Sequence, residues 1–551
     1  MLNRREFLKT SALAGAAMAT QPIQSHASRH QDSTGFFGVH PFIENHPDAV
    51  FIMRTSANVV LDSPGKKSAG EEFGRSVIIP RESGVPLTSL IPIKPNIRYE
   101  HGWNVNVGSG KIAASEVQGY KGTDAFFVEG VIESLKELGI SAEQIFIREV
   151  NSRSDGGGSG DYPAMAQRTG AEMRYMGDKV GVIDNNDLVW VETPEGIWYR
   201  KIPYIWPINA ENSWLLNIAK LKAHGMGLTL CAKNLQGSIA KNYQAHCTAY
   251  TAKMDMDYTN HKNPNSSPDI LDNYERHKAD GYPRWDKLGA ATFNSGLGME
   301  TWASRCLDNN RATPCGLHII EGIYAVDGNF NVGPHTSSGL DLNEKNGESW
   351  ELLTNYVIFG MNAFHVDSIG HWLGGHEPGN LGLLHMAIEN GLSNKVNPMG
   401  IPVYEWKDGA AQLTTLTEFE RTEILTYYLQ RNYDGQTENY WHLLNEPFDY
   451  SSLPGGETSV DAEPVTFTLH QNHPNPFNPN TSIEFSLAKS GNARLEVYNA
   501  AGQLVDVLAD GYHAPGAHMA TWNTSRHSSG IYFYRLRVGD LTETKKMTLL
   551  K

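Results

Sequence analysis

TDAFFVEGVIESLKELG at residues 123–139, followed by QIFIREV at residues 144–150, is the stretch that decides the fold. The first segment has helical periodicity, and Gly139 ends it. The second segment is an apolar run with the length of a strand. A helix that leads directly into a strand predicts a sheet covered by helices. The apolar residues that share the helical face are Phe126, Phe127, Val131, Leu135 and Leu138.

Working outward, we expect a mixed α/β domain over residues 75–445, which a strand at Ser76–Pro80 opens. Residues 28–74 are expected to form an N-terminal extension. A polar stretch rich in Asn and Pro, near residues 253–287, has no strong period and is predicted to be an insertion. The glycine-rich residues 156–160 lack the Lys-Ser/Thr ending of a phosphate-binding loop, which favours an ordinary mobile loop.

Charge and cysteine content restrict the class of protein. The 551 residues carry 46 Lys and Arg against 61 Asp and Glu, a net charge of -15, which argues against a nucleic-acid partner. The four cysteines form no CxxC pair, so we expect no iron–sulfur cluster. Cys306 and Cys315 are close enough in sequence to form a disulfide in an oxidising compartment; the alternative is two buried thiols.

The densest chemistry lies in NIAKLKAHGMGLTLCAKNLQG at residues 217–237. Lysines in an apolar setting either meet carboxylates or hold an anionic ligand. If residues 217–224 form a strand, its period of two places Lys220, Lys222 and His224 on one face. This predicts a cationic face with a titratable histidine; the alternative is a solvated strand edge with a core histidine.

These motifs resemble those of the domain-of-unknown-function family 362 (DUF362), over most of residues 75–395. The resemblance implies no particular reaction, because the family has no general activity assigned to it. Many relatives carry ferredoxin-type clusters, whose cysteine motifs this sequence lacks. The motifs that carry the resemblance are Lys94-Pro95-Asn96, then Lys220, Lys222, His224, Thr229, Lys233, Asn234 and Gly237, then Ile319–Gly322 with Gly333-Pro334, and Ala363–Asp367.

We interpret this block as the pocket of an enzyme that acts on a small anionic substrate. His224 would move a proton, and Lys222 and Lys233 would hold negative charge as the other catalytic residues. The alternative is a non-catalytic surface protein that captures a ligand or metal in the same pocket. A third hypothesis attaches a covalent cofactor to a buried lysine. The expected ligand-binding residues are Lys94, Asn96, Lys220, Thr229 and Asn234.

A second group of residues raises the hypothesis of a divalent metal ion. His365, Asp367, His371 and His376 offer imidazole and carboxylate ligands within a short stretch. Their spacing matches no standard zinc motif. The alternative is a set of ordinary helix-end and surface histidines.

The first 27 residues are expected to be an export signal. Arg4-Arg5-Glu6-Phe7-Leu8-Lys9 resembles a twin-arginine signal, and Ser25-His26-Ala27 offers a cleavage site. The resemblance implies the twin-arginine translocase as a partner and export of an already folded chain. The weakly apolar residues 10–20 are too short to span a membrane, and no other segment approaches the ~20 apolar residues of a span.

The last part of the chain, residues 464–551, reads as a separate small β-sandwich of the immunoglobulin-like type. Strand-like alternation at residues 482–487 and 493–498 is separated by turn signals such as Ala501-Gly502. Residues 446–463 are rich in Ser, Pro, Gly and acid, which is typical of a linker.

Three motifs of this tail resemble the type IX secretion C-terminal sorting domain. They are QNHPNPFNP at residues 471–479, LEVYNAAG at residues 495–502 and GIYFYRL at residues 530–536. The resemblance implies the type IX machinery as a second partner and an extracellular or outer-membrane surface location. The alternative is an immunoglobulin-like adhesion module with no sorting role.

Overall fold

The computed structural model describes residues 35–97, 122–150, 161–174, 187–224, 227–240, 296–327, 349–424 and 467–550, the last with short gaps. It also describes short pieces between residues 105 and 112 and between residues 426 and 452. The predicted signal at 1–27 and the predicted insertion near 253–287 lie outside these ranges. Most of the predicted linker, from residue 453 onward, lies outside them too.

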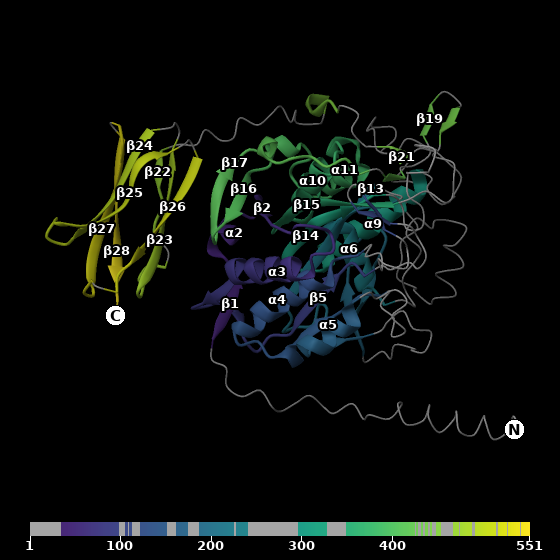
Figure 1. Ribbon diagram of the computed structural model, residues 1–551, viewed down its shortest axis with the longest axis horizontal. Helices are drawn as coiled ribbons and strands as arrows, with labels where there is room; N and C mark the ends of the chain where they lie inside the picture. The colour runs from purple at the N-terminus through teal and green to yellow at the C-terminus, as the bar shows by residue number, and fades with distance from the viewer. Residues whose placement is uncertain are drawn as a thin grey trace, which may run out of the picture.

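The central domain is built on one mixed sheet with the order β17-β16-β2-β15-β14-β12-β5-β8-β9 (Figure 1). The neighbours from β14 to β9 are parallel, whereas β15 is antiparallel to both β14 and β2. The strands are β17 (Ala410–Thr414), β16 (Val403–Lys407), β2 (Val50–Arg54), β15 (Ser349–Gly360), β14 (Cys315–Val326), β12 (Leu215–His224), β5 (Ile91–Pro95), β8 (Ile145–Ile147) and β9 (Glu172–Met173).

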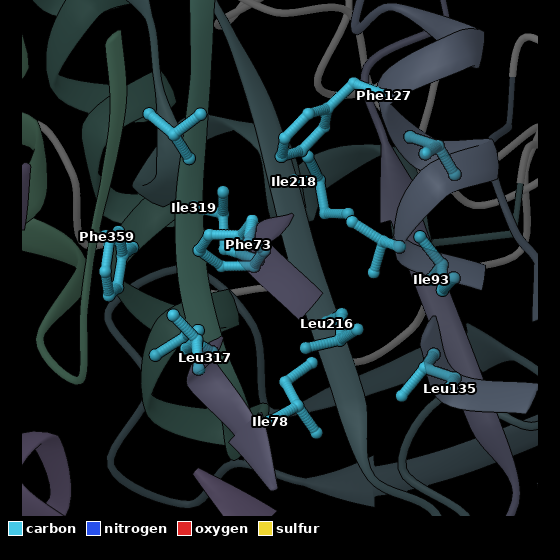
Figure 2. Packing of buried hydrophobic residues seen from close by; sticks show 14 of the residues in the cluster. Phe73, Ile78, Ile93, Phe127, Leu135, Leu216, Ile218, Leu317, Ile319 and Phe359 are labelled. Atoms are coloured by element: carbon cyan, nitrogen blue, oxygen red, sulfur yellow. The ribbon is translucent and has the colours of Figure 1, made fainter. Parts of the chain in front are cut away.

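Helices cover both faces of this sheet, which confirms the α/β class expected from the sequence. On one face α3 (Ser63–Val77) and α4 (Ala125–Glu137) bury Phe73 and Phe127 against Leu216 and Ile319 of the strands (Figure 2). On the other face the strands are covered by α6 (Cys231–Asn234), α9 (Gly296–Ala312), α10 (Ala363–Leu373) and α11 (Gly382–Glu389).

The deciding stretch folds as expected. α4 begins after Asp124, whose side chain accepts a hydrogen bond from Phe126 N, and the chain turns at Gly139 with φ +99°. The run that follows forms β8. The periodicity of the sequence was sufficient to predict this helix and this strand, because both segments bury one continuous apolar surface.

The start of the central domain differs from the expected boundary at residue 75. β2 and α3 lie within the expected extension, yet β2 pairs with both β15 and β16 inside the sheet. The expected strand at Ser76–Pro80 is also shifted, since α3 continues to Val77 and β3 covers Ile78–Arg81. β3 pairs with β1 (Phe36–Val39) in a separate small sheet. Residues 36–77 are therefore part of the fold.

The chain reverses its direction across the sheet between β5 and β12. From β5 the chain crosses through α4 to β8, with α4 on the Phe73 face. From β12 it crosses to β14 on the other side, and α6 and α9 of that connection lie on the opposite face. The carboxyl ends of β5 and β12 therefore form a topological switch point, where open α/β sheets bind their ligands.

The tail forms two antiparallel sheets around its own core, as predicted for the immunoglobulin-like sandwich. One sheet has the order β22-β23-β26 and the other β25-β24-β27-β28. The predicted strands at 482–487 and 493–498 lie within β23 and β24. The strands are β22 (Thr468–Leu469), β23 (Asn480–Leu487), β24 (Gly491–Asn499), β25 (Leu504–His513), β26 (Gly516–Asn523), β27 (Gly530–Val538) and β28 (Leu541–Leu549).

Two further observations bear on the sequence predictions. Cys306 and Cys315 are separate thiols and form no disulfide with each other; Cys306 is buried and Cys315 is partly buried. No helix in the described parts of the chain has the length and apolar character needed to cross a membrane.

Helices α3 and α4 approach so closely that a glycine is required at their contact. A Cβ atom on Gly130 would lie 2.1 Å from the Lys67 carbonyl oxygen and 2.6 Å from Glu71 N, both backbone atoms. Backbone atoms cannot move aside as the end of a flexible side chain can, so any side chain here forces the helices apart.

We therefore expect Gly130→Ala to lower the free energy of unfolding by about 1–3 kcal/mol, the usual cost of overpacking. Urea denaturation of the mature protein measures this change. Glu72→Ala, at an exposed position of α3, is the matched control and should leave the stability within about 0.5 kcal/mol of wild type. An equal stability of the two variants would contradict the close contact.

Candidate functional site at the switch point

The candidate residues lie on both faces of the central sheet. Leu216 and Ile218 pack with the α3–α4 core, so the alternation of the strand directs Lys220 to that side. Asn217 points to the opposite side, and its register partner on β5 is Lys94. The single pocket expected from the sequence is thus two layers of polar residues, one on each side of the sheet.

On the α4 side, Lys220 forms a buried ion pair with Glu321 of the neighbouring strand β14. Lys220 Nζ lies 2.9 Å and 2.8 Å from the two carboxylate oxygens, and both side chains are 0% exposed. The ammonium group also lies 3.1 Å from the centre of the Tyr324 ring, a cation–π contact. Burial lowers the pKa of Lys220, and the charge of Glu321 opposes this shift.

A second buried ion pair adjoins the first. Lys66 of α3 donates to Asp124 Oδ2 at 2.7 Å and to the Val60 carbonyl oxygen at 2.9 Å. Asp124 N in turn donates to Glu321 Oε2 at 3.0 Å, so the two pairs share one network at the start of α4. Each buried charge therefore has an opposite charge and a further hydrogen bond, as burial of ions requires.

On the α6 side, Lys94 is paired with Glu149, which follows β8. Lys94 Nζ donates to Glu149 Oε2, to the Pro95 carbonyl oxygen at 2.6 Å and to Asn234 Oδ1 at 3.2 Å. Gly237 packs directly against this pair, because a Cβ there would lie 2.6 Å from Glu149 Oε1. Burial lowers the pKa of Lys94, opposed by Glu149 and reinforced by the positive charge of Lys233.

The amide groups of Asn217 and Asn234 complete this layer. Asn234 Nδ2 donates to the Lys94 carbonyl oxygen at 2.9 Å and to Asn217 Oδ1 at 2.8 Å. Asn217 Nδ2 lies 2.9 Å from the Cys231 carbonyl oxygen and 3.0 Å from His318 Nδ1, which accepts. Burial lowers the pKa of His318 to about 4, so the ring is neutral near pH 7.

The two layers meet at the carboxyl edge through Asn96 and Thr123. Asn96 N donates to Thr123 Oγ1 at 2.9 Å, and Thr123 Oγ1 donates to the Ile218 carbonyl oxygen at 2.8 Å. Asn96 Nδ2 lies 3.4 Å from Asn234 Oδ1, whereas the buried Asn96 Oδ1 has no hydrogen-bond partner among the described residues. Such an atom needs a partner that the described residues do not provide.

The remaining candidates lie further along β12 and its hairpin partner β13 (Gly227–Thr229). Lys222 pairs in register with Thr229, and His224 pairs with Gly227. Lys222, His224 and Thr229 are all buried, and Thr229 Oγ1 has no hydrogen-bond partner within the described ranges. Lys233, on α6, is partly exposed. The structure therefore brings Lys222, His224 and Thr229 together on one hairpin, and Lys233 beside Lys94.

The four candidate metal ligands are not brought together as a metal site. Asp367 accepts hydrogen bonds from the backbone of α6, His365 Nδ1 donates to the Asp48 carbonyl oxygen, and His376 Nε2 donates to the Ile424 carbonyl oxygen. His371 is buried, with a ring-centre distance of 6.1 Å to His376. Across the described ranges, no group of three or more His, Cys, Asp or Glu side chains has a metal-binding arrangement.

Sequence reasoning missed several residues that complete the two layers. Glu149 and Asp124 lie inside the predicted strand and helix, whereas in the structure Glu149 follows β8 and Asp124 precedes α4. His318 and Lys66 had no local signal, because only the packing of distant segments brings them to the site.

Comparison with known families gives three matches along the chain. Residues 111–370 match the model of "Domain of unknown function (DUF362)". Residues 472–549 match "Secretion system C-terminal sorting domain". Residues 1–20 match "TAT (twin-arginine translocation) pathway signal sequence". The chain is therefore an exported protein, secreted or at the cell surface, whose central residues 111–370 match the DUF362 model.

Comparisons with individual proteins add little to these families. A search of curated proteins finds no match. Among solved structures, the chain has a similarity to PorZ, described as an essential bacterial surface component of the type-IX secretion system of human oral-microbiomic Porphyromonas gingivalis. That similarity has 13% identity and a TM-score of 0.12, and covers 15% of this chain and 11% of that chain.

Because Glu321 would keep its buried charge without a partner, we expect Lys220→Met to cost about 3–5 kcal/mol of unfolding free energy. The double variant Lys220→Met/Glu321→Gln should recover part of that loss. Urea denaturation measures both. The matched control is Lys201→Met, which breaks the exposed pair with Glu192 and should cost under about 1 kcal/mol. Equal costs for Lys220→Met and Lys201→Met would refute the buried pair.

His318 should make the protein less stable in acid. Its folded pKa of about 4 lies below the ordinary 6.5, so between these values the unfolded chain binds the extra proton and acid favours unfolding. His318→Leu removes this proton uptake. The loss of stability between pH 7.5 and pH 5 should therefore be about 2 kcal/mol smaller in the variant, measured by urea denaturation at both pH values. An unchanged loss would show that His318 takes up no proton on unfolding.

Proposed function

We propose that this exported protein binds a small anionic ligand at the carboxyl edge of its central sheet, with Lys222, His224 and Lys233 as the groups that act on it. The observation that carries the proposal is the position of these groups at the switch point between β5 and β12. In open α/β sheets, the crossover connections leave a crevice at that point.

The two internal layers support an anionic ligand rather than a cationic one. Lys66, Lys94 and Lys220 are each neutralised by a buried carboxylate, so these pairs add no net charge to the edge. Lys222 at the end of β12 and Lys233 on α6 are the two further lysines that this proposal assigns to the ligand. A low-dielectric setting strengthens the attraction between such lysines and an anion.

Neutral hydrogen-bonding groups at the same edge would orient the ligand. Asn96 Oδ1 and Thr229 Oγ1 are buried atoms that lack a hydrogen-bond partner within the described part of the chain. A hydroxyl or protonated oxygen of the ligand could donate to them, which would remove the cost of leaving them unsatisfied. In this proposal Lys94, Lys220 and Asn234 form the rigid support of the site rather than direct contacts.

Two functions fit this site, an enzyme and a capture protein. We favour the enzyme because His224 lies on the same hairpin as Lys222, so a proton carrier and a charge clamp face one region. A capture protein would use the same lysines without proton transfer. No step through a metal ion is part of either function.

A thermal-shift titration of the mature protein with inorganic phosphate and with malonate tests the anion site. Ligand at about 100 times its Kd should stabilise the native state by about 2.7 kcal/mol. We expect Lys222→Met and His224→Gln to abolish this stabilisation. Lys407→Met, an exposed lysine at the end of β16, is the matched control and should retain it. No stabilisation of wild type by either anion would overturn the proposal.

Incubation with a panel of small phosphate and carboxylate esters, followed by NMR, separates the two functions. Turnover that disappears in His224→Gln identifies an enzyme. Binding of the same anions without turnover identifies capture.

A further inference from the structure

Asp367 of α10 caps α6 from a distant part of the chain. Its Oδ1 accepts a hydrogen bond from Cys231 N at 2.7 Å, and its Oδ2 accepts one from Ala232 N at 2.9 Å. These amides open α6, where a helix has no carbonyl partners of its own. The two donors lie 136 and 135 residues away in sequence, so this is a tertiary contact rather than a local cap.

The other end of α6 is anchored to the strands of the site. Asn234 bonds to the Lys94 carbonyl oxygen on β5 and to Asn217 Oδ1 on β12. Asn310 of α9 also donates to the Ala232 carbonyl oxygen at 2.9 Å. A helix of a single turn cannot maintain its own geometry, so these external anchors decide where its side chains lie.

We propose that Asp367 is a positioning residue for the anion site: by holding the first two amides of α6, it fixes the place of Lys233 at the carboxyl edge. This inference rests on the proposed function of that edge. Without Asp367, the first turn of α6 loses two hydrogen bonds to its backbone amides, and Lys233 is distributed over several positions. The ligand would then meet one fixed positive charge fewer, although Asp367 never touches it.

A second aspartate in the same domain offers a matched control. Asp308 of α9 is also buried, and its carboxylate accepts hydrogen bonds of 2.7 Å from the backbone amides of Ile197, Trp198 and Tyr199. Removal of Asp308 therefore costs a similar set of bonds, but in a segment that carries none of the proposed ligand contacts. The Asp308 variant therefore shows whether a change in phosphate affinity comes from a general loss of stability or from displacement of Lys233.

The experiment compares Asp367→Ala, Asp367→Asn and Asp308→Ala in the full mature protein. Phosphate affinity is measured by titration, and hydrogen exchange of the peptide that contains residues 231–234 is followed by mass spectrometry. We expect Asp367→Ala to weaken phosphate binding about tenfold and to speed exchange at this peptide. Asp367→Asn keeps one acceptor oxygen, so its effect should be smaller. Asp308→Ala should lower stability and leave phosphate affinity unchanged.

The two readouts separate the possible failures. If wild type binds no phosphate or malonate, the anion site itself is wrong, and the positioning role falls with it. If wild type binds phosphate and Asp367→Ala binds it equally well, only the positioning role is wrong. An equal loss of affinity in Asp308→Ala would likewise reduce Asp367 to a general contribution to stability.

Discussion

Burial of a charged lysine in a sheet is costly unless a carboxylate is buried beside it, and the central domain meets this constraint at Lys94 and Lys220. Lys220 and Glu321 are register partners on adjacent parallel strands, so their pairing also specifies how β12 and β14 align. A shift of one of these strands by one residue would turn its charge to the opposite face of the sheet, away from its partner. The pair between Lys94 and Glu149 joins β5 to the segment after β8 in the same way. These pairs therefore act on the register of the sheet as well as on its charge.

The same pairs shape what the carboxyl edge can offer to a ligand. Beyond these inner ion pairs, the further lysines of this edge lie on β12 and on α6. Their support is rigid, because Asn234 uses both its donor and its acceptor groups within the framework. In our proposal, this edge binds a ligand that is recognised by charge and held by few hydrogen bonds.

Local patterns predicted the helix at 123–139, the strand at 144–150 and the strands of the tail, because each of these segments shows its own period. The partners of the lysines could not be predicted, since Glu149 and Glu321 lie 55 and 101 residues from Lys94 and Lys220. For His365, Asp367, His371 and His376, proximity in sequence suggested a common site that the packing does not form. Ligand-like residue types lie close in sequence there, yet backbone groups from distant segments occupy His365, Asp367 and His376.

The position of β2 has a consequence for how the chain acquires its structure during synthesis. Residues 50–54 lie between β15 and β16 in the sheet, so the earliest central strand must wait for partners that emerge from the ribosome some 300 to 350 residues later. Until then its apolar edges have no strand to pair with, and a chaperone would have the longest opportunity to bind this segment. The leader therefore emerges from the ribosome long before the strands of the central sheet have all been synthesised. A twin-arginine substrate crosses the membrane folded. The start of its export must therefore depend on when the last strand emerges from the ribosome, although the signal emerges first.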